Sequence, residues 1–239
     1  MPEPLVGLYE DAHVLAVDKP AGRLTQGRRG GEETLEDDAR AYLNPDAPAS
    51  VYLGAVHRLD RPVSGVVLLA KTPKAARRLA AQFSAREVTK EYWAVVEARP
   101  GFPEPGSEGV WDDWLLGSTD VSGAVRGAAE GDPAARRAVT RFRRESARAP
   151  EGCVRLRLWP ETGRTHQLRA QAALRGWPVV GDAVYGSTRD PAGPAVALHA
   201  RSVVFRHPTL GRPVTVVAPL PETWRERGWL DAGPGVSRS

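Results

Sequence analysis

The chain has 239 residues, with 33 Lys and Arg against 29 Asp and Glu, and 41% of its residues are hydrophobic. This composition is typical of a globular protein, and the length suffices for one large domain or two small ones. A disulfide scaffold is excluded because Cys153 is the only cysteine. The longest apolar runs, 66–70 and 92–96, are far shorter than the ~20 residues that span a bilayer. Acidic residues interrupt the first 18 positions, so we expect no secretory signal and a cytoplasmic protein.

Apolar patterning over the first hundred residues predicts strands at 12–18, 65–71 and 90–98, and helices at 34–43 and from 73 onward. The second helix has Thr72 as a candidate N-cap and Pro73 at its first position. Its apolar residues Ala75, Leu79 and Phe83 recur every four residues, which predicts one buried stripe.

The remaining chain is predicted to hold strands at 137–144, 153–159, 196–206 and 214–218, a helix at 165–175, loops at 99–109 and 117–133, and a frayed tail at 231–239. The strand at 153–159 alternates strictly between apolar residues and Arg or Trp. Several neighbouring strands have no helix between them, which indicates an α+β fold with a mixed, largely antiparallel sheet. We expect one domain over residues 1–230.

Charge is segregated along the second half of the chain. Residues 101–133 carry seven acidic residues and one basic residue, whereas residues 134–169 carry ten Arg and three acidic residues. A basic face of this kind suits a polyanion such as nucleic acid. Alternatively, the acidic segment balances it in space, and charge alone leaves both interpretations open. The total of 29 Arg against 4 Lys is weaker evidence, because a genome rich in G and C also favours arginine.

The densest polar cluster is HRLDRPVSG at residues 57–65, which precedes an apolar strand. Its Asp60 is flanked by Arg58 and Arg61, whose guanidinium groups favour an ionised carboxylate. Two interpretations are open for this carboxylate. It carries chemistry, or it only caps backbone N–H groups in an Asx-type turn. Composition alone favours the turn.

A second cluster, ETGRTHQLR at residues 161–169, opens the helix expected at 165–175. Gly163 permits a tight turn, and Thr165 is a candidate cap. Arg164, His166 and Arg169 then fall near the positive end of the helix dipole, which suits an anion. An ordinary strand-to-helix turn with exposed arginines is the alternative.

Three elements in this order resemble the RluA-type family of pseudouridine synthases: HRLDRPVSG, KEYWAV at 90–95, and GRTHQLR at 163–169. Flanking segments agree with the family, namely DKPAG at 18–22, GDAVYG at 181–186 and LHA at 198–200. The resemblance covers about residues 8–224, and Arg61-Pro62 resembles the subgroup that modifies tRNA. It implies the family's catalytic domain over residues 1–230.

The family that the chain resembles converts uridine in rRNA or tRNA to its C-glycoside isomer, without cofactor or metal. The resemblance implies that Asp60 is the catalytic aspartate, acting as a nucleophile or as a base on the ribose. It implies that Tyr92 offers a stacking face to the uracil and a hydroxyl for late proton removal from C5. Arg169 matches the arginine that pairs with Asp60.

The resemblance also implies substrate contacts in both clusters. The residues expected to bind substrate are Arg58, Arg164, His166 and Leu198. Arg58 matches a residue that helps occupy the gap left by the extruded nucleotide. The chain departs from the family at Val63, where Thr is frequent, and at Thr25-Gln26, where relatives often carry His. Many relatives have an additional N-terminal S4 RNA-binding domain, whereas the match in this chain starts with the catalytic domain. RNA recognition is therefore expected from the catalytic domain itself.

Two rival functions fit the sequence less well. A non-catalytic RNA-binding protein derived from this fold has no use for a carboxylate in a basic groove. A metal-dependent hydrolase is disfavoured because the five His residues show no HExxH or Cys/His zinc spacing, so no metal site is expected. We therefore expect RNA as the partner, with no membrane and no obligate protein partner, and a monomer by default.

Overall fold

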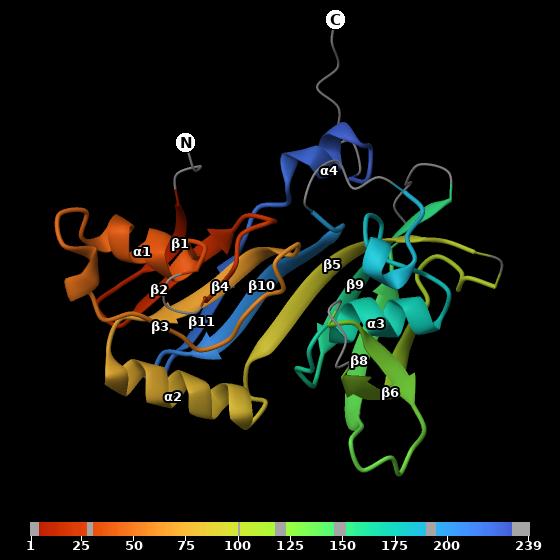
Figure 1. The fold of residues 1–239 in the computed structure, drawn as a ribbon, viewed down its shortest axis with the longest axis horizontal. Helices are drawn as coiled ribbons and strands as arrows, with labels where there is room; N and C mark the ends of the chain where they lie inside the picture. Colours follow the sequence, from red (N-terminus) through yellow and green to blue (C-terminus); the bar gives the residue numbers. More distant parts are fainter. Residues whose placement is uncertain are drawn as a thin grey trace, which may run out of the picture. The chain divides into compact units, whose positions relative to one another are not determined.

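A computed structural model describes residues 5–27, 31–99, 101–117, 123–145, 152–189 and 195–230 (Figure 1). Its contacts divide the chain into two compact units. Unit 1 comprises Met1–Tyr92 and His199–Pro219, and unit 2 comprises Trp93–Leu198 and Leu220–Ser239. Strands β5 (Thr89–Glu97) and β10 (Leu198–Arg206) each pass from one unit into the other. The tail expected at 231–239 lies outside the described residues, and a single catalytic domain over 1–230 stays a prediction.

Unit 1 is built on a sheet with the strand order β1-β2-β4-β10, in which β3 pairs with β4 and β11 with β10. The β4–β10 pair is parallel, whereas the other pairs described here are antiparallel. Its remaining elements are β1 (Val6–Glu10), β2 (Val14–Lys19), α1 (Leu35–Leu43), η1 (Pro48–Ser50), β3 (Gly54–Ala55), β4 (Ser64–Ala70), α2 (Pro73–Ser84) and β11 (Pro213–Val217). This mixed, largely antiparallel sheet confirms the expected α+β fold class.

Helix α2 runs alongside β3 and β4 (Figure 1). Thr72 is its N-cap and accepts a hydrogen bond from the backbone N–H of Ala75, as expected for Thr-Pro at a helix start. Ala75 and Leu79 are fully buried against alternate residues of β2 and β4, and the half-buried Phe83 packs against the same cluster. The predicted apolar stripe is therefore the face that covers one side of the sheet.

The parallel pair of β4 and β10 depends on a glycine. Gly65 lies opposite Ala200 with a φ of +113°. A Cβ at Gly65 would stand 2.6 Å from the backbone nitrogen of Ala200 and closer still to its carbonyl oxygen. Only glycine permits this close approach. The start of β4, which follows the Asp60 turn, therefore lies directly against β10.

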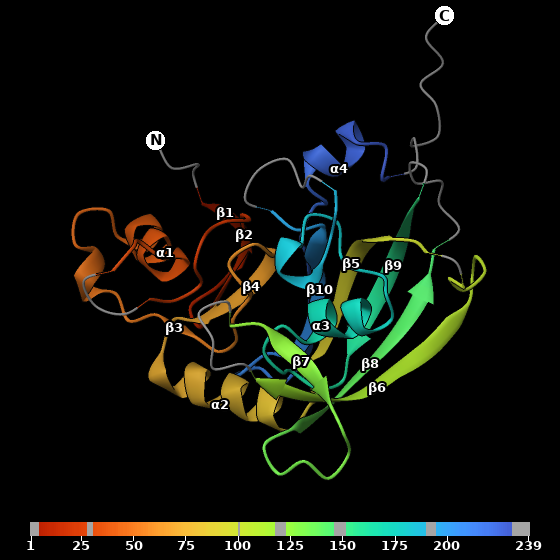
Figure 2. The same ribbon diagram turned by 45° about the vertical axis from the view of Figure 1, so that its right-hand side comes forward.

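Unit 2 is a sheet in the order β5-β9-β8-β6-β7, with antiparallel pairing from β9 to β7. Figure 2 shows the β6–β7 hairpin, and helix α3 contacts both of its strands. The elements are β6 (Glu108–Gly117), β7 (Val125–Ala128), β8 (Arg136–Arg144), β9 (Cys153–Pro160), α3 (Gln167–Leu174), η2 (Ala183–Tyr185) and α4 (Glu222–Glu226). The buried residues Val154, Leu156 and Leu158 form the apolar side of β9, as its alternation predicts.

The structure corrects two loop expectations. The loop predicted over 117–133 is wrong at Val125–Ala128, where β7 pairs with β6. The loop predicted over 99–109 is wrong at Glu108 and Gly109, which are the first two residues of β6. Glycines at 109, 117 and 127 obscure both strands in the sequence, because glycine is normally depleted in strands.

Candidate active site

The Asp60 turn stands between two buried anchors. Leu59 and Val63 are buried on either side of it, while the Asp60 side chain is partly exposed and Arg58 and Arg61 are exposed. The backbone N–H of Val63 donates to the Asp60 carbonyl at 3.0 Å and closes the turn. The turn therefore presents a carboxylate at the surface of unit 1.

Thr25 fixes this turn from the preceding loop. The buried Thr25 hydroxyl donates to the Leu59 carbonyl at 3.1 Å and accepts from the Leu59 N–H at 3.2 Å. Gly22 and Arg61 are joined nearby by a backbone hydrogen bond of 2.8 Å and by the Arg61 guanidinium. Sequence reasoning placed Thr25 only as a departure from the family, and the structure gives its side chain a clear role.

Lys19 places a buried ammonium beneath the turn. Its side chain is fully buried, and Nζ donates to the carbonyls of Pro20, Arg23 and Arg61 at 2.9, 2.6 and 3.1 Å. Burial lowers the pKa of Lys19 to about 7, and the charge of nearby Asp60 opposes this shift. The end of β2 therefore supplies both hydrogen bonds and positive charge to the Asp60 turn.

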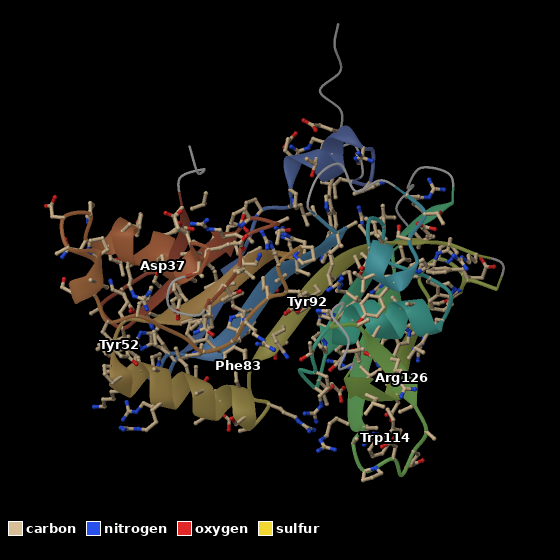
Figure 3. The ribbon with its side chains drawn as sticks, viewed as in Figure 1. Asp37, Tyr52, Phe83, Tyr92, Trp114 and Arg126 are labelled. Atoms are coloured by element: carbon tan, nitrogen blue, oxygen red, sulfur yellow. The ribbon has the colours of Figure 1, made fainter. Side chains whose placement is uncertain are left out.

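Tyr92, labelled in Figure 3, lies on β5. It is close enough to Asp60 for the charge of that carboxylate to act on its hydroxyl. Burial raises the pKa of the Tyr92 hydroxyl well above its usual value, and the Asp60 charge adds to the shift. The hydroxyl is therefore protonated at neutral pH and is able to donate a hydrogen bond. Asp60 and Tyr92, predicted as catalytic from distant segments, share one neighbourhood in unit 1.

His57, at the start of the motif, is a structural acceptor. Its Nε2 accepts a hydrogen bond from the backbone N–H of Leu68 at 2.9 Å, and its ring stacks on Phe83 at 4.8 Å. Burial lowers the pKa of His57 to about 3, and the charge of Lys90 adds to the shift. A neutral His57 therefore ties the motif to β4 and to α2.

Arg169 lies on α3 in unit 2, where it is held by Asp182. Its Nε and Nη2 donate to the two Asp182 oxygens at 2.6 and 2.8 Å, and both side chains are buried. The predicted pairing of Arg169 with Asp60 joins residues of the two units, and it stays a prediction. Because Nε and Nη2 of Arg169 bind Asp182, the predicted pairing with Asp60 uses the other edge of the guanidinium, which carries Nη1.

The start of α3 differs from the predicted turn. His166, rather than Thr165, is the N-cap, and its backbone has a positive φ of +50°. Thr165 does not cap the helix; instead the Gln167 side chain accepts from the Arg164 N–H at 3.0 Å. A strained non-glycine residue next to α3 is a frequent mark of a functional site.

The three polar residues of this cluster do not share one environment. Arg164 is exposed and donates to the Arg137 carbonyl, His166 is partly buried and bonds to Tyr185, and Arg169 is buried. The proposed anion site at the helix start is therefore formed by Arg164 and His166 at most. Leu198, the fourth predicted substrate contact, is buried at the start of β10.

Comparison with known proteins identifies the chain. The model of the RNA pseudouridylate synthase family matches residues 13–174, a segment that contains Asp60, Tyr92 and Arg169. The chain belongs to the RNA pseudouridylate synthase family. As a member, it is an RNA pseudouridine synthase, an enzyme that isomerises uridine in RNA.

Relatives of this synthase match along most of its length. An uncharacterised RNA pseudouridine synthase of Zymomonas mobilis is 39% identical over 229 residues, which cover 93% of this chain and 96% of that protein. Ribosomal large subunit pseudouridine synthase D of Xanthomonas campestris is 37% identical, over 92% of this chain and 67% of that protein. The structure of human RNA pseudouridylate synthase domain containing 1 has a TM-score of 0.71 at 27% identity, over 91% of this chain and 84% of that chain.

The basic segment of the synthase is balanced by the acidic segment before it. Strands β6 and β8 pair so that Glu108 lies opposite Arg143, and Arg137 bonds Asp112 through Nε at 2.8 Å and Nη2 at 2.5 Å. Trp114, labelled with Arg126 in Figure 3, lies opposite Arg137. Among the described residues, two ion pairs join the segments, Arg137–Asp112 and Arg143–Glu108, while Arg141–Glu161 and Arg157–Glu145 lie within the basic segment. The balanced interpretation therefore describes Arg137 and Arg143.

Two further findings concern the part of the chain that the structure describes. No group of three or more His, Cys, Asp and Glu side chains there is arranged to hold a metal ion. None of the helices in the same residues has the length and hydropathy to cross a membrane.

Proposed function

We propose that this synthase isomerises uridine in ribosomal or transfer RNA and that the Asp60 carboxylate acts at the junction of sugar and base. The names of its curated relatives include a ribosomal large subunit synthase and a tRNA synthase, which supports these two RNA classes as substrates. No cofactor is needed in this proposal, because the reaction moves one glycosidic bond within a single molecule.

One observation carries the proposal. Asp60 stands on a turn pinned by Lys19 and Thr25, with the Tyr92 hydroxyl in its electrostatic neighbourhood. A carboxylate that serves only as a turn cap needs neither a buried lysine bonded to its turn nor a phenol within the range of its charge. Fixed placement of this kind is what a reacting group requires.

In the proposed reaction, Asp60 attacks C1′ or removes a ribose proton, and the bond between N1 and C1′ breaks. The freed uracil turns against the ring of Tyr92, and C5 bonds to C1′. As C5 bonds to C1′, the Asp60–C1′ bond breaks in the nucleophilic route, or Asp60 returns its proton to the ribose in the base route, and either step restores the Asp60 carboxylate. The C5 proton then leaves to solvent and N1 gains a proton. Arg169 pairs with Asp60 in this scheme and holds its carboxylate in place.

The target nucleotide leaves its stack to reach Asp60, at a cost of about a few kcal/mol. The exposed Arg58 next to Asp60 helps to fill the gap, and Arg164, His166 and Leu198 complete the substrate contacts. Phosphate contacts offset the cost of extrusion and make RNA binding depend on salt. We also propose that the synthase acts on RNA in the cytoplasm as a monomer, without an obligate protein partner.

The test is release of tritium from RNA labelled at uracil C5, because isomerisation expels that hydrogen. Ribosomal RNA and tRNA, each prepared from cells that lack the gene, are incubated separately with the full chain. We expect release from one or both fractions, to a plateau of about one tritium per modified uridine. If both fractions bind the protein and neither releases tritium, the rival function of a non-catalytic RNA-binding protein is correct.

A further inference from the structure

Asp182, which sequence reasoning gave no role of its own, forms the most enclosed ion pair described in unit 2. Both its oxygens accept hydrogen bonds from Arg169, at 2.6 Å from Nε and 2.8 Å from Nη2. The side chains of Arg169 and Asp182 are only 4% and 1% exposed. Two parallel bonds of this kind fix the plane of a guanidinium as well as its position.

Tyr185 covers the face of the same guanidinium. The Arg169 Cζ lies 5.1 Å from the centre of the Tyr185 ring, within the range of a cation–π contact. The Tyr185 hydroxyl accepts from the Val125 N–H at 2.8 Å and bonds His166 Nδ1 at 3.1 Å. Asp182 and Tyr185 belong to one short segment, so this segment holds both the edge and the face of Arg169.

That segment is itself anchored on β5. The Asp182 carbonyl accepts from the N–H groups of Tyr185 and Ser187, both at 3.0 Å. The Ser187 hydroxyl in turn donates at 2.6 Å to Glu97, a buried residue at the end of β5. These bonds hold Asp182 in place in the absence of substrate. Through its two hydrogen bonds, Asp182 in turn fixes the position of the Arg169 guanidinium.

In the reaction proposed above, Arg169 pairs with Asp60, and the chemistry changes the charge of that partner. Attack on C1′ converts the Asp60 carboxylate to a neutral ester, and removal of a ribose proton converts it to a neutral acid. A buried cation that loses its counter-charge is strongly destabilised. With Asp182 bound to its other edge, Arg169 keeps a counter-charge throughout the reaction.

We propose that Asp182 is a positioning residue that holds Arg169 by charge while the Asp60 carboxylate is neutral. This inference rests on the proposed function of Asp60 and Arg169. The neutral variant Asp182→Asn keeps the size of the side chain and loses its charge, so Arg169 loses its constant counter-ion.

Helix α3 provides a matched control at its other end. Arg175 bonds Asp113 at 3.0 and 3.4 Å, and its Cζ lies 5.0 Å from the centre of the Trp111 ring. This pair repeats the carboxylate and aromatic partners of Arg169 at a site with no part in the proposed reaction. The control pair is more exposed, at 23% and 20%, and Asp113 also accepts from Gln171 at 2.8 Å. Asp113→Asn therefore measures how the loss of a partly exposed arginine counter-ion at this helix affects folding.

The experiment measures single-turnover tritium release and thermal unfolding for wild type, Asp182→Asn and Asp113→Asn. We expect Asp182→Asn to lower the maximal single-turnover rate by about 10- to 100-fold, the range of one charge-assisted hydrogen bond, with little change in the RNA concentration for half-maximal rate. Asp113→Asn is expected to lower the unfolding temperature without a comparable loss of rate. Equal rates in the two variants, whether high or low, would overturn the proposal.

A second readout keeps this test separate from the test of Asp60. Hydrogen exchange of the Arg169 Nε–H, followed by NMR in the full chain, reports the ion pair directly. We expect slow exchange in wild type and in Asp113→Asn, and at least tenfold faster exchange in Asp182→Asn. Unchanged exchange in Asp182→Asn would show that Asp182 does not hold Arg169, even if wild type released no tritium and the proposed function failed.

Discussion

The buried ammonium of Lys19 and the carbonyl of Arg61 are joined by a hydrogen bond of 3.1 Å that ties the end of β2 to the Asp60 turn. The same ammonium also bonds two carbonyls of the loop that follows β2. One side chain thus holds together two segments that lie about 40 residues apart, and it brings a positive charge near Asp60.

Lys19→Met is expected to destabilise the protein by about 2 kcal/mol, because the carbonyls of Pro20, Arg23 and Arg61 lose the buried donor that joins them. It also changes the pH dependence of stability. The folded-state pKa of about 7 lies below the ordinary value for lysine, so as pH rises from 7 to 9 the folded chain loses this proton while the unfolded chain keeps it. Wild-type stability should gain about 2 kcal/mol from this group over that window.

Urea unfolding of wild type and Lys19→Met at pH 7, 8 and 9 measures this effect. The difference between the two free energies of unfolding should widen as pH rises, since the methionine side chain of the variant does not titrate. A difference that stays constant from pH 7 to pH 9 would mean that Lys19 is not held with a lowered pKa.

Gly65→Ala is expected to cost about 3 kcal/mol or more, because its Cβ would collide with the backbone of Ala200 at a φ of +113°. Gly211→Ala is the matched control. Gly211 also has a positive φ, of +71°, but a Cβ there has open space around it. Its replacement should therefore cost only the backbone strain, about 1 kcal/mol. Equal losses in chemical denaturation would show that β4 and β10 tolerate a wider spacing.

Arginines of the synthase are expected to differ in their effect on RNA binding according to their partners. Arg58 is exposed and has no ion pair among the described residues, whereas Arg137 is bonded to Asp112. Arg58→Gln should make the negative slope of log K for RNA binding against log salt shallower by about 0.7 to 0.9, the value of one phosphate contact. Arg137→Gln should leave it unchanged. Filter binding at several salt concentrations measures both, and the reverse order would restore the polyanion interpretation of residues 134–169.

Tyr92→Phe should retain stacking of the uracil and lose only the hydroxyl. Because that hydroxyl is protonated at neutral pH, it is a poor base, and we expect the single-turnover rate to fall less than about tenfold. Tyr92→Ala removes the ring and should lower the rate by about 10- to 100-fold. A loss in Tyr92→Phe as large as that in Tyr92→Ala would assign proton transfer, rather than stacking, as the main role of this residue.

The sequence predicts those parts of the fold that local rules govern. The Thr72-Pro73 start of α2 and the alternation of β9 both follow from short-range patterns, and both are confirmed. Within residues 161–169 the predicted cap at Thr165 is wrong: His166 is the N-cap, with a φ of +50°, and its ring bonds the Tyr185 hydroxyl. Local propensity gives way where packing determines the backbone.

The candidate site shows the same division. The motif around Asp60 is visible in the sequence, but its supports at Lys19 and Thr25 come from contacts between segments distant in the chain. Asp182 is missed because a carboxylate in a Gly-Asp turn is ordinary, and only burial beside Arg169 distinguishes it. The match of acidic β6 to basic β8 depends on strand register, which charge counts do not contain.

The central claim is that one carboxylate, that of Asp60, performs the isomerisation. Asp60→Asn keeps the size of the side chain and removes its charge, so it separates chemistry from binding. Tritium release from RNA labelled at uracil C5, measured under single-turnover conditions with excess enzyme, is the most direct test. We expect release by Asp60→Asn to fall to the background without enzyme while RNA binding stays within about twofold of wild type. Substantial turnover by Asp60→Asn would contradict the account.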